Sequence, residues 1–330
     1  MGEQTILVTG GAGYVGAHAC FALAQAGYRI AVVDSLANGH RRFAKYGPLF
    51  EIDIRDQATL AAVLAETKPA AVLHFAALIE VGESVKDPAA FYDVNVRGTL
   101  NLLAAMRATG VEKIVFSSTC ATYGPPQRLP LDETHPQAPI NPYGWTKLMI
   151  ERAILDMGAA YGLKAAILRY FNAAGAAPDE GLGERHSPET HAIPLALFAL
   201  LGRRQGFSVF GTDYDTRDGT AVRDYIHVLD LADAHVRALK RLLDGGDTQA
   251  FNLGVGDGVS VKELLAAIER VTGRRLDAAL ADRRPGDAPA LVADARKAAD
   301  MLGWRPTRSL DAILADAWRW HGEVEPALFG

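Results

Sequence analysis

Cysteine and long hydrophobic runs are both scarce in this chain. Only two of the 330 residues are cysteine, Cys20 and Cys120, and neither has neighbours spaced like metal ligands. A disulfide framework is therefore excluded, and we expect no metal site. No apolar run approaches the roughly 20 residues of a membrane-spanning helix, and the first residues lead into an apolar strand without a secretory signal. These observations predict a cytoplasmic protein with no membrane partner.

An excess of charge of one sign is also missing. The chain has 34 Lys and Arg against 39 Asp and Glu, a formal net charge of −5, and both signs are spread along it. No basic block suits a nucleic acid, so we expect no nucleic-acid partner. Internal repeats and low-complexity linkers are absent from the sequence as well. With 49% hydrophobic residues, the chain is long enough for one large domain or two unequal ones.

The chain does contain a glycine-rich connection close to its start. The surrounding segments read in turn as strand, helix and strand: residues 5–9, 17–26 and 28–33. Three glycines lie between the first two: Gly10, Gly13 and Gly16. This spacing lets the backbone turn tightly and approach a pyrophosphate at the start of the helix. Asp34 ends the second strand, where a carboxylate binds the adenosine ribose of NAD and disfavours NADP. A glycine-rich turn without a ligand is the alternative.

Strand and helix patterns then alternate through the first half of the chain. Further strands are predicted at residues 49–52, 70–75, 111–116 and 165–170, and helices at 58–66, 91–109 and 145–161. Such alternation predicts an α/β protein with a doubly wound, Rossmann-type parallel sheet. We expect an NAD-binding domain in residues 1–175, with returning segments near 226–255. Residues 176–330 should form mainly a smaller, interleaved α/β lobe.

Polar and small residues follow several of the predicted strands at their carboxyl ends. They are the glycine loop, Asp34, Asp53, Phe75, Thr119 and Tyr170. Ligands of open parallel sheets bind beyond the carboxyl ends of the strands. We therefore expect these residues to share one edge of the sheet and to surround one site.

Tyr143 and Lys147 are four residues apart, so they share one face of a helix. Among the ten tyrosines only Tyr143 has a lysine at this spacing. A nearby ammonium favours the phenolate, so we expect Lys147 to lower the pKa of Tyr143 and make it a general base or acid. The Thr119 hydroxyl would then hold the substrate oxygen whose proton moves. A solvated helix face is the alternative for the pair.

These motifs together resemble the extended short-chain dehydrogenase/reductases. Within that family the chain is similar to the UDP-galactose (UDP-glucose) 4-epimerases from end to end, through residues 81–85, 142–144, 169–172, 218–228 and 252–254. The resemblance implies that Tyr143 takes the proton of the sugar 4-hydroxyl while a hydride passes to tightly held NAD. The hydride would return to the opposite face of C4. It also implies a homodimer that pairs through helices 91–109 and 145–161.

The resemblance also assigns residues to each ligand. Catalysis would fall to Thr119, Tyr143 and Lys147. The cofactor would be bound by Gly10, Gly13, Tyr14, Val15, Gly16, Asp34, Asn38, Asp53, Ile54, Phe75, Ala76, Ala77, Asn95, Ser117, Tyr143, Lys147 and Tyr170. The UDP-sugar would be bound by Thr119, Tyr143, Phe171, Asn172, His191, Val209, Phe210, Arg223, Arg284, Asp287 and Leu291. A satisfied buried amide is the alternative for Asn95, and a surface ion pair for the arginines.

Two positions depart from the family pattern, and three other functions stay open. Ile79 stands where well-known members carry lysine beside the cofactor. Leu291 stands at the position that limits the size of the sugar 2-substituent, so N-acetylhexosamines and pentoses remain candidate substrates. A nucleotide-sugar dehydratase is disfavoured because Cys120 and Ala121 replace the acid pair that follows the threonine in those relatives. A non-catalytic NAD-binding regulator is disfavoured by the intact Thr119, Tyr143 and Lys147.

Overall fold

A seven-stranded parallel sheet forms the centre of the protein. The structure is a computed structural model that describes residues 4–283 and 287–329. Its large sheet has the strand order β11-β6-β5-β4-β1-β2-β3. The strands are β1 (Thr5–Thr9), β2 (Arg29–Asp34), β3 (Leu49–Glu51), β4 (Ala71–His74), β5 (Lys113–Thr119), β6 (Lys164–Tyr170) and β11 (Gln249–Leu253). The order reverses between β1 and β4, as it does in dinucleotide-binding sheets. The predicted Rossmann-type class is confirmed.

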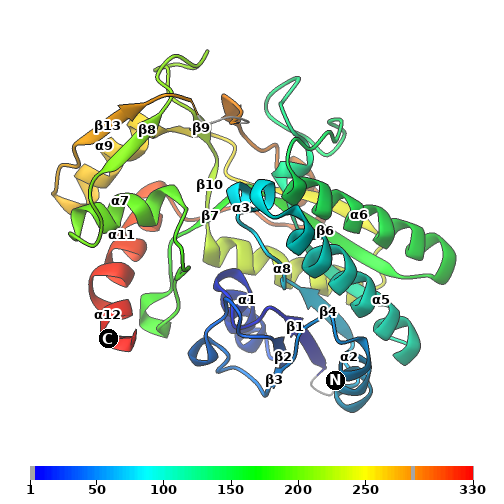
Figure 1. Cartoon of the computed structure of the whole chain (residues 1–330). Coiled ribbons are helices and arrows are strands. Elements are labelled where there is room, and N and C mark those ends of the chain that lie inside the picture. Colours follow the sequence, from blue (N-terminus) through cyan, green and yellow to red (C-terminus); the bar gives the residue numbers. More distant parts are fainter. Residues whose placement is uncertain (1–3, 284–286, 330) are drawn as a thin grey trace.

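Helices cover both faces of this sheet (Figure 1). One face carries α1 (Tyr14–Gln25) and α8 (Val228–Leu243), and the other carries α2 (Gln57–Thr67), α5 (Gly98–Thr109) and α6 (Pro142–Tyr161). Successive side chains of a strand point to opposite faces. In β1, Ile6 and Val8 therefore join the core under α1 and α8, whereas Leu7 joins the core under α2, α5 and α6. Burial on both faces explains why these strands read as continuous apolar runs.

A smaller lobe follows the sixth strand and has a core of its own. Its main elements are β8 (Phe207–Phe210), β13 (Ala278–Ala281), α7 (Ala192–Leu200), α9 (Val261–Thr272) and α11 (Leu310–Arg319). Figure 1 shows this lobe beside the large sheet, with the C-terminus on its outer side. The chain leaves the lobe to supply α8 and β11 and then returns to it. The assignment of each lobe to one ligand remains a prediction.

Short elements complete the lobe and the connections. They are α3 (Val81–Lys86), α4 (Pro88–Phe91), α10 (Arg296–Leu302), α12 (Glu325–Phe329), β7 (Asn172–Ala174), β9 (Val222–Arg223), β10 (Tyr225–His227), β12 (Val259–Ser260) and β14 (Ala290–Leu291). Strand β9 lies between β12 and β14 in a three-stranded sheet. This small sheet holds Arg223 beside Leu291, because these two residues are directly paired.

Two predicted helices differ from the observed ones in ways that affect the site. Helix α6 begins at Pro142 and not at residue 145, because the Asn141 side chain caps it by accepting a bond from the Gly144 amide at 2.8 Å. Tyr143 therefore lies in the first turn of the helix. The segment predicted as one helix, 91–109, contains a π-helical stretch, Tyr92–Arg97, before α5. Such stretches are frequent at functional sites.

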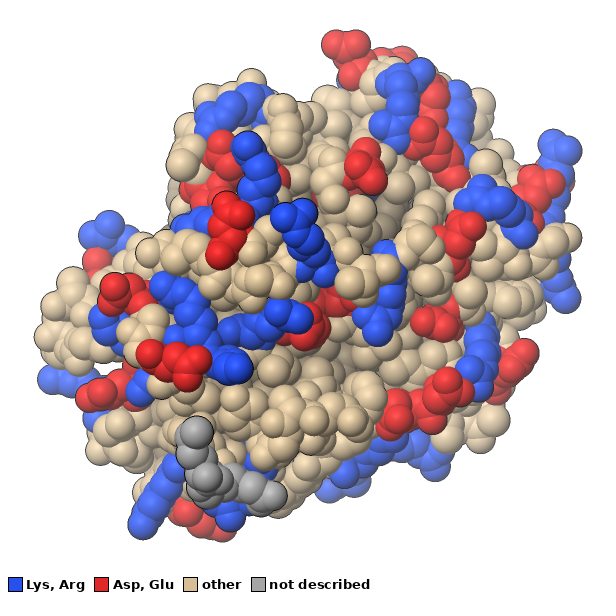
Figure 2. Space-filling model, turned by 180° about the vertical axis from the view of Figure 1, so that it is seen from behind, with Lys and Arg blue, Asp and Glu red and all other residues tan. Residues whose placement is uncertain are grey.

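Two features of the structure concern membrane and charged partners: the hydropathy of its helices and the distribution of charge on its surface. Across residues 4–283 and 287–329, no helix combines the length and the hydropathy that crossing a bilayer requires. Figure 2 shows acidic and basic side chains intermingled over one face of the molecule.

Three of the buried histidines are held neutral by the fold. Burial lowers the pKa of His74 to about 3 and the pKa values of His18 and His235 to about 4. In the unfolded chain these rings titrate near pH 6.5. As the pH falls below about 6.5, the unfolded state therefore binds protons that the folded state does not. The free energy of unfolding should fall by up to about 1.4 kcal/mol per pH unit for each ring.

The variant His235→Phe tests the expected pH dependence for one of the three rings. His235 donates one bond from Nδ1 to the Leu231 carbonyl at 2.8 Å, and its Nε2 has no hydrogen-bond partner among the described residues. Phenylalanine keeps an aromatic ring at this position, where the ring centres of His235 and Phe75 are 4.7 Å apart. Denaturant unfolding between about pH 7 and pH 5 should show a pH slope smaller by about one proton in the variant. Equal slopes in the two proteins would contradict the neutral state of His235.

Candidate functional site

The glycine loop after β1 forms a cradle that only glycine can line. A Cβ atom on Gly16 would lie 2.1 Å from the Gly10 carbonyl oxygen, and one on Gly10 would lie 2.5 Å from the Ala76 amide nitrogen. Gly10 also has a φ of +73°, which L side chains rarely adopt. The loop leads into α1, whose N-cap, Gly13, has no side-chain capping bond. The first amides of α1, including those of Tyr14 and Val15, therefore suit an anion such as a pyrophosphate.

Asp34 lies beside this cradle at the end of β2. Its two carboxylate oxygens accept bonds from the Ala12 amide at 2.9 Å and the Leu36 amide at 2.8 Å. Burial raises the pKa of Asp34, and the two amides oppose that rise. The carboxylate is thus fixed at the end of β2, against the Ala12 amide of the glycine loop, which is where a ribose binds in this fold. The donors present fit a dinucleotide at this edge of the sheet.

Other residues predicted to bind the cofactor occupy the same edge or its margin. Asn38 is exposed in the loop after β2, and Ile54 is buried after β3. Asp53 forms an ion pair with Arg55 at 2.5 Å, which lowers the pKa of Asp53. The residues Phe75, Ala76 and Ala77 follow β4 directly. Their roles in binding remain predictions.

Asn95 connects the π-helical stretch to the helix that carries Tyr143. Its side chain accepts a bond from the Leu78 amide at 2.8 Å and donates to the Leu78 carbonyl at 3.0 Å and the Thr146 hydroxyl at 3.1 Å. Both amide hydrogens are thus used within the protein. This geometry fits the alternative of a satisfied buried amide that orders the site.

Thr119, Tyr143 and Lys147 meet where β5 ends and α6 begins. Thr119 is the last residue of β5, and the interaction of its side chain with the Tyr143 phenol opposes the rise that burial causes in the pKa of Tyr143. The Lys147 side chain is buried, and its ammonium donates to the Ser117 carbonyl at 2.9 Å. Its nitrogen lies 5.9 Å from the centre of the Tyr143 ring. The hydroxyl of Ser117 in turn bonds that of Tyr170 at the end of β6.

The prediction that Lys147 lowers the pKa of Tyr143 was wrong. Burial raises the pKa of Tyr143 well above its usual range, and the Tyr170 phenol adds to the rise. Burial likewise lowers the pKa of Lys147 to about 7, against the opposing charge of Glu151. The physical reason is that both groups are withdrawn from water, and burial is the largest cause of each shift.

A buried ion pair behind the lysine was missed by the sequence analysis. Glu151, one turn after Lys147, binds Arg169 of β6 at 2.6 Å and accepts a bond from the Ser118 hydroxyl. Arg169 also donates to the Tyr123 hydroxyl at 3.0 Å. This network joins α6 to the ends of β5 and β6. Its only signal in the sequence is a glutamate spaced four residues after the lysine.

A cleft in the smaller lobe lies beyond the same edge and holds about 180 Å³ of space that water-sized molecules can occupy. Its lining includes five of the residues predicted to bind the substrate: Asn172, His191, Phe210, Arg223 and Asp287. Arg223 lies near Asp287, with 3.7 Å between guanidinium and carboxylate.

The remaining substrate predictions fall elsewhere. Val209 is buried in the core of the lobe, while its neighbours Ser208 and Phe210 face the cleft. Phe171 and Leu291 pack in a separate cluster with Cys120, next to Thr119. Arg284 lies outside the described residues.

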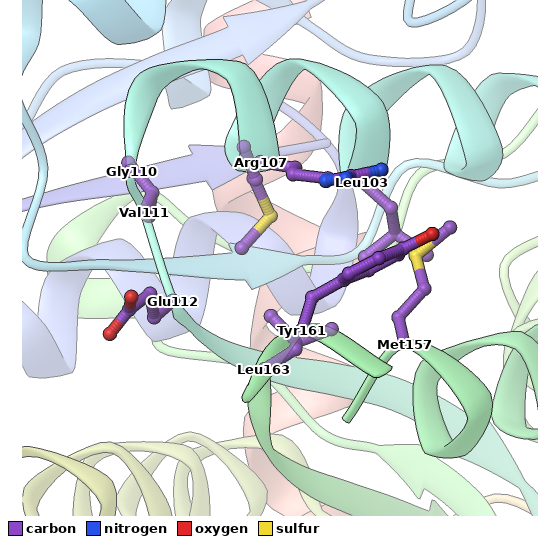
Figure 3. Close-up of a pocket in the computed structure, with 9 residues that line it drawn as sticks. Leu103, Arg107, Gly110, Val111, Glu112, Met157, Tyr161 and Leu163 are labelled. Carbon is purple, nitrogen blue, oxygen red and sulfur yellow. The ribbon is translucent and has the colours of Figure 1, made fainter. Parts of the chain in front are cut away.

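A second hollow lies at the opposite edge of the sheet. It holds about 80 Å³ of water-accessible space between the C-terminal ends of α5 and α6, where β5 and β6 begin. Figure 3 shows the Arg107 side chain lying over the Tyr161 ring, 3.7 Å from the guanidinium carbon to the ring centre. This hollow lies at the amino ends of the strands and is therefore separate from Tyr143 and the glycine loop, which lie at the carboxyl ends.

Comparisons with known proteins agree with this geometry. A family model described as the NAD dependent epimerase/dehydratase family matches residues 6–254. A protein of Rhizobium leguminosarum bv. trifolii named UDP-glucose 4-epimerase is 61% identical, over 98% of this chain and 99% of its own. The solved UDP-glucose 4-epimerase of Brucella ovis in complex with NAD is 49% identical, with a TM-score of 0.94 over 97% of this chain and 98% of its own.

A second similar structure carries a sugar nucleotide. It is a UDP-glucose 4-epimerase of Stenotrophomonas maltophila with bound NAD and formylated UDP-arabinopyranose. It is 41% identical and has a TM-score of 0.95, over 98% of this chain and all of its own. The similarities span nearly the whole length of each chain, so they include both lobes and the edge where Thr119, Tyr143 and Lys147 meet. The protein therefore belongs to the NAD-dependent epimerase/dehydratase family.

Proposed function

We propose that the protein is a UDP-glucose/UDP-galactose 4-epimerase that works with a tightly bound NAD. The observation that carries this proposal is the meeting of Thr119, Tyr143 and Lys147 between the glycine cradle and the cleft. Relatives and solved structures with this name, over nearly the full chain, support it. Two relatives that are each 61% identical to this chain are named UDP-glucose 4-epimerase, which supports a UDP-hexose as the substrate.

The chain's own residues would divide the work as follows. Tyr143 takes the proton of the sugar 4-hydroxyl and later returns it, while the Thr119 hydroxyl holds the same oxygen. Lys147, fixed on the Ser117 carbonyl, keeps a donor beside the phenol. NAD supplies the hydride acceptor for C4 and a positively charged ring that opposes the rise in the Tyr143 pKa. Arg223 is placed to bind the diphosphate through its guanidinium.

Inversion at C4 requires the oxidised sugar to turn while the nucleotide stays in place. A cleft that fixes the nucleotide at Asn172 and Arg223 leaves the sugar side near Tyr143 less constrained. A dehydratase needs an acid and a base after the threonine. Here Cys120 follows, and burial raises the pKa of its thiol to about 12, so it cannot serve as either near neutral pH.

Turnover without added cofactor is the test of the proposal. Purified protein should interconvert UDP-glucose and UDP-galactose with no NAD in the assay, and acid denaturation should release about one dinucleotide per chain. A panel that adds UDP-N-acetylhexosamines and UDP-pentoses resolves the effect of Leu291. Inactivity on every UDP-sugar, or a protein that neither carries nor binds a dinucleotide, would overturn the assignment.

We further propose a homodimer that pairs through α5, α6 and the preceding helical turns. This face exposes large apolar side chains, of which Trp145 and Met149 on α6 are 42% and 43% exposed and Leu100 on α5 is 40% exposed. Light scattering after size exclusion should give twice the chain mass at micromolar concentration. Met149→Glu should weaken the pairing and give the monomer mass, whereas the exposed Met301→Glu on α10 should not. A wild-type monomer would contradict the dimer.

Two coarser expectations complete the proposal. Residues 1–175, with the segment near 226–255, would hold NAD, and residues 176–330 would mainly hold the UDP-sugar. The separation of the glycine cradle from the cleft supports this division. A cytoplasmic location is supported by two cysteines that are both free and buried.

A further inference from the structure

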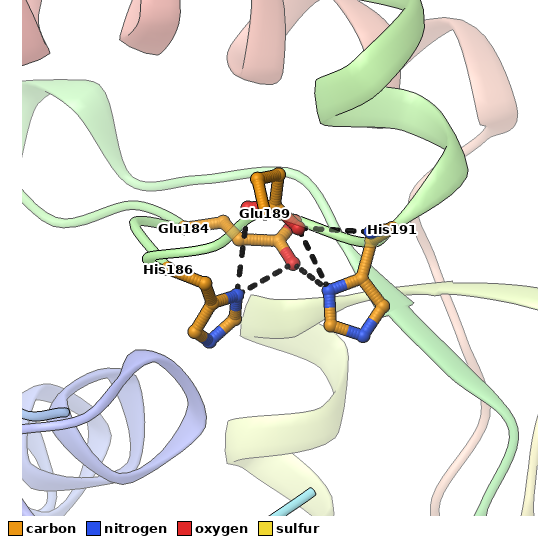
Figure 4. A group of neighbouring side chains, drawn as sticks. All are labelled: Glu184, His186, Glu189 and His191. Carbon is orange, nitrogen blue, oxygen red and sulfur yellow. Dashed lines mark hydrogen bonds and ion pairs between the residues drawn. The ribbon is translucent and has the colours of Figure 1, made fainter. Parts of the chain in front are cut away.

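Four potential metal ligands gather in the irregular segment that precedes α7. They are Glu184, His186, Glu189 and His191, and one donor atom from each lies within 4.8 Å of all the others. Figure 4 shows both imidazole rings directed at the two carboxylates. The sequence analysis singled out only His191 and expected no metal. The four residues lie within eight consecutive positions, 184–191, but on no predicted helix or strand.

The distances within this cluster are those of a four-coordinate metal site. His186 Nδ1 lies 3.4 Å from Glu184 Oε1 and 3.5 Å from Glu189 Oε2. His191 Nδ1 lies 3.2 Å from Glu189 Oε1 and 2.7 Å from Glu184 Oε1. A tetrahedral zinc ion with ligands at roughly 2.0–2.2 Å separates neighbouring donors by about 3.3–3.6 Å. Three of these four separations are close to that value, although they use both oxygens of Glu189, and the four donor atoms as a set lie within 4.8 Å of one another.

The carboxylates are buried, and hydrogen bonds do not account for all of their oxygens. The side chains of Glu184 and Glu189 are each 5% exposed. Within the described part of the chain, Glu184 Oε1 and Glu189 Oε2 accept no well-aligned hydrogen bond, and His186 Nδ1 makes none either. Buried charges of this kind are normally paired or bound to a metal. The nearby Arg185 is directed elsewhere, with its Nε 3.4 Å from Glu325 and its guanidinium over the Phe329 ring.

We propose that Glu184, His186, Glu189 and His191 bind a divalent transition-metal ion of the zinc class. Two imidazoles and two carboxylates suit zinc, and its double positive charge balances the two glutamates. The cluster lies between the two binding regions. Glu184 and His191 line the cleft, and the His186 ring meets the edge of the Tyr14 ring at 6.2 Å. Tyr14 begins α1 and donates to the Gly175 carbonyl at 2.6 Å. A bound ion would thus fix the segment that joins the cleft to the cofactor helix.

Metal uptake by the whole protein tests the proposal without reference to its activity. Tag-free protein, stripped with a chelator and dialysed against zinc, should retain one equivalent per chain by elemental analysis and show a higher thermal midpoint. Cobalt in place of zinc should give the visible absorption of a tetrahedral site. Uptake of less than about a tenth of an equivalent would overturn the proposal and leave the four residues as an ion-pair network.

Matched variants locate the ion. Glu189→Gln keeps an oxygen for the Thr190 and His191 amides, which Glu189 Oε1 now binds at 2.8 and 2.9 Å, but removes the charge. It should weaken zinc binding by more than the roughly 10- to 100-fold that losing a supporting group costs a metal site. His186→Asn should weaken zinc binding to a similar extent, and it serves as the test variant if Glu189→Gln does not fold. His321→Asn breaks another His–Glu pair, with Glu325 at 3.0 Å, and should retain the ion. Equal uptake by all four proteins would place the metal elsewhere and refute the site.

Discussion

Replacing Tyr143 with phenylalanine is expected to abolish epimerisation while leaving the dinucleotide bound. The Tyr143 ring lies beside Lys147, with 5.9 Å from the lysine nitrogen to the ring centre, and the Thr119 side chain acts on its phenol. Loss of a general acid–base group costs about 10²- to 10⁴-fold in rate. Phenylalanine keeps the ring and its packing, so the change removes the transferable proton alone. The measurement is the turnover of UDP-galactose, together with the dinucleotide released on denaturation.

A second tyrosine of the same helix provides the control. Tyr161 lies at the far end of α6 and is 50% exposed, so Tyr161→Phe should leave the rate within about twofold. A Tyr143→Phe protein that retains a tenth or more of wild-type activity would show that another group moves the proton. An inactive wild type that still binds NAD would instead favour the regulatory alternative.

Gly16→Ala is expected to produce the largest loss of cofactor. The added methyl group would lie 2.1 Å from the Gly10 carbonyl oxygen and 2.9 Å from its carbon, so the backbone of the loop has to move. Overpacking of this kind costs about 1–3 kcal/mol in stability. Displaced loop amides should weaken NAD binding at least about tenfold, which corresponds to roughly 1.4 kcal/mol. The variant should be purified with little dinucleotide and should regain activity only at high added NAD.

The matched control is the same substitution at an open glycine. Gly322 is exposed, and a Cβ there would meet only Leu201 Cδ2, at an ordinary contact distance of 3.8 Å. Gly322→Ala should therefore keep its bound dinucleotide. If Gly16→Ala is purified with as much NAD as this control, the glycine loop does not hold the pyrophosphate.

The fold was predictable because the alternation of strands and helices is carried by local patterns. Strands buried on both faces read as short apolar runs, and Gly10, Gly13 and Gly16 marked the first crossover. Boundaries were harder to predict. The start of α6 depends on Asn141 acting as a cap, and the π-helical stretch Tyr92–Arg97 has no pattern distinct from that of an α-helix. Both differences lie at the site, where local rules are most often overridden.

The candidate site was predictable in position and less so in electrostatics. Strand order brings Asp34, Thr119 and Tyr143 to one edge, and strand order follows from topology. The pKa of Tyr143 depends on how deeply the site is buried, which residue spacing does not reveal. The same limit applies to Val209, whose side chain enters the lobe core although Phe210 faces the cleft. The ion pair of Glu151 with Arg169 is a three-dimensional association with little signal in sequence, whereas the four proposed metal ligands lie within eight consecutive residues, 184–191.

Strand β11 makes the two halves of the gene difficult to exchange between relatives. It pairs with β6, and its Asn252 accepts a bond from the Tyr123 hydroxyl at 2.7 Å and donates to the Leu131 carbonyl at 2.8 Å. A single crossover after β6 would give a chimera whose last sheet strand comes from the other parent. In such a hybrid, the β11 strand from the other parent must supply an acceptor for the Tyr123 hydroxyl in place of Asn252. On the ribosome, the edge of β6 likewise stays open until residue 253 has emerged, so the nascent chain carries an unpaired edge strand through much of its synthesis.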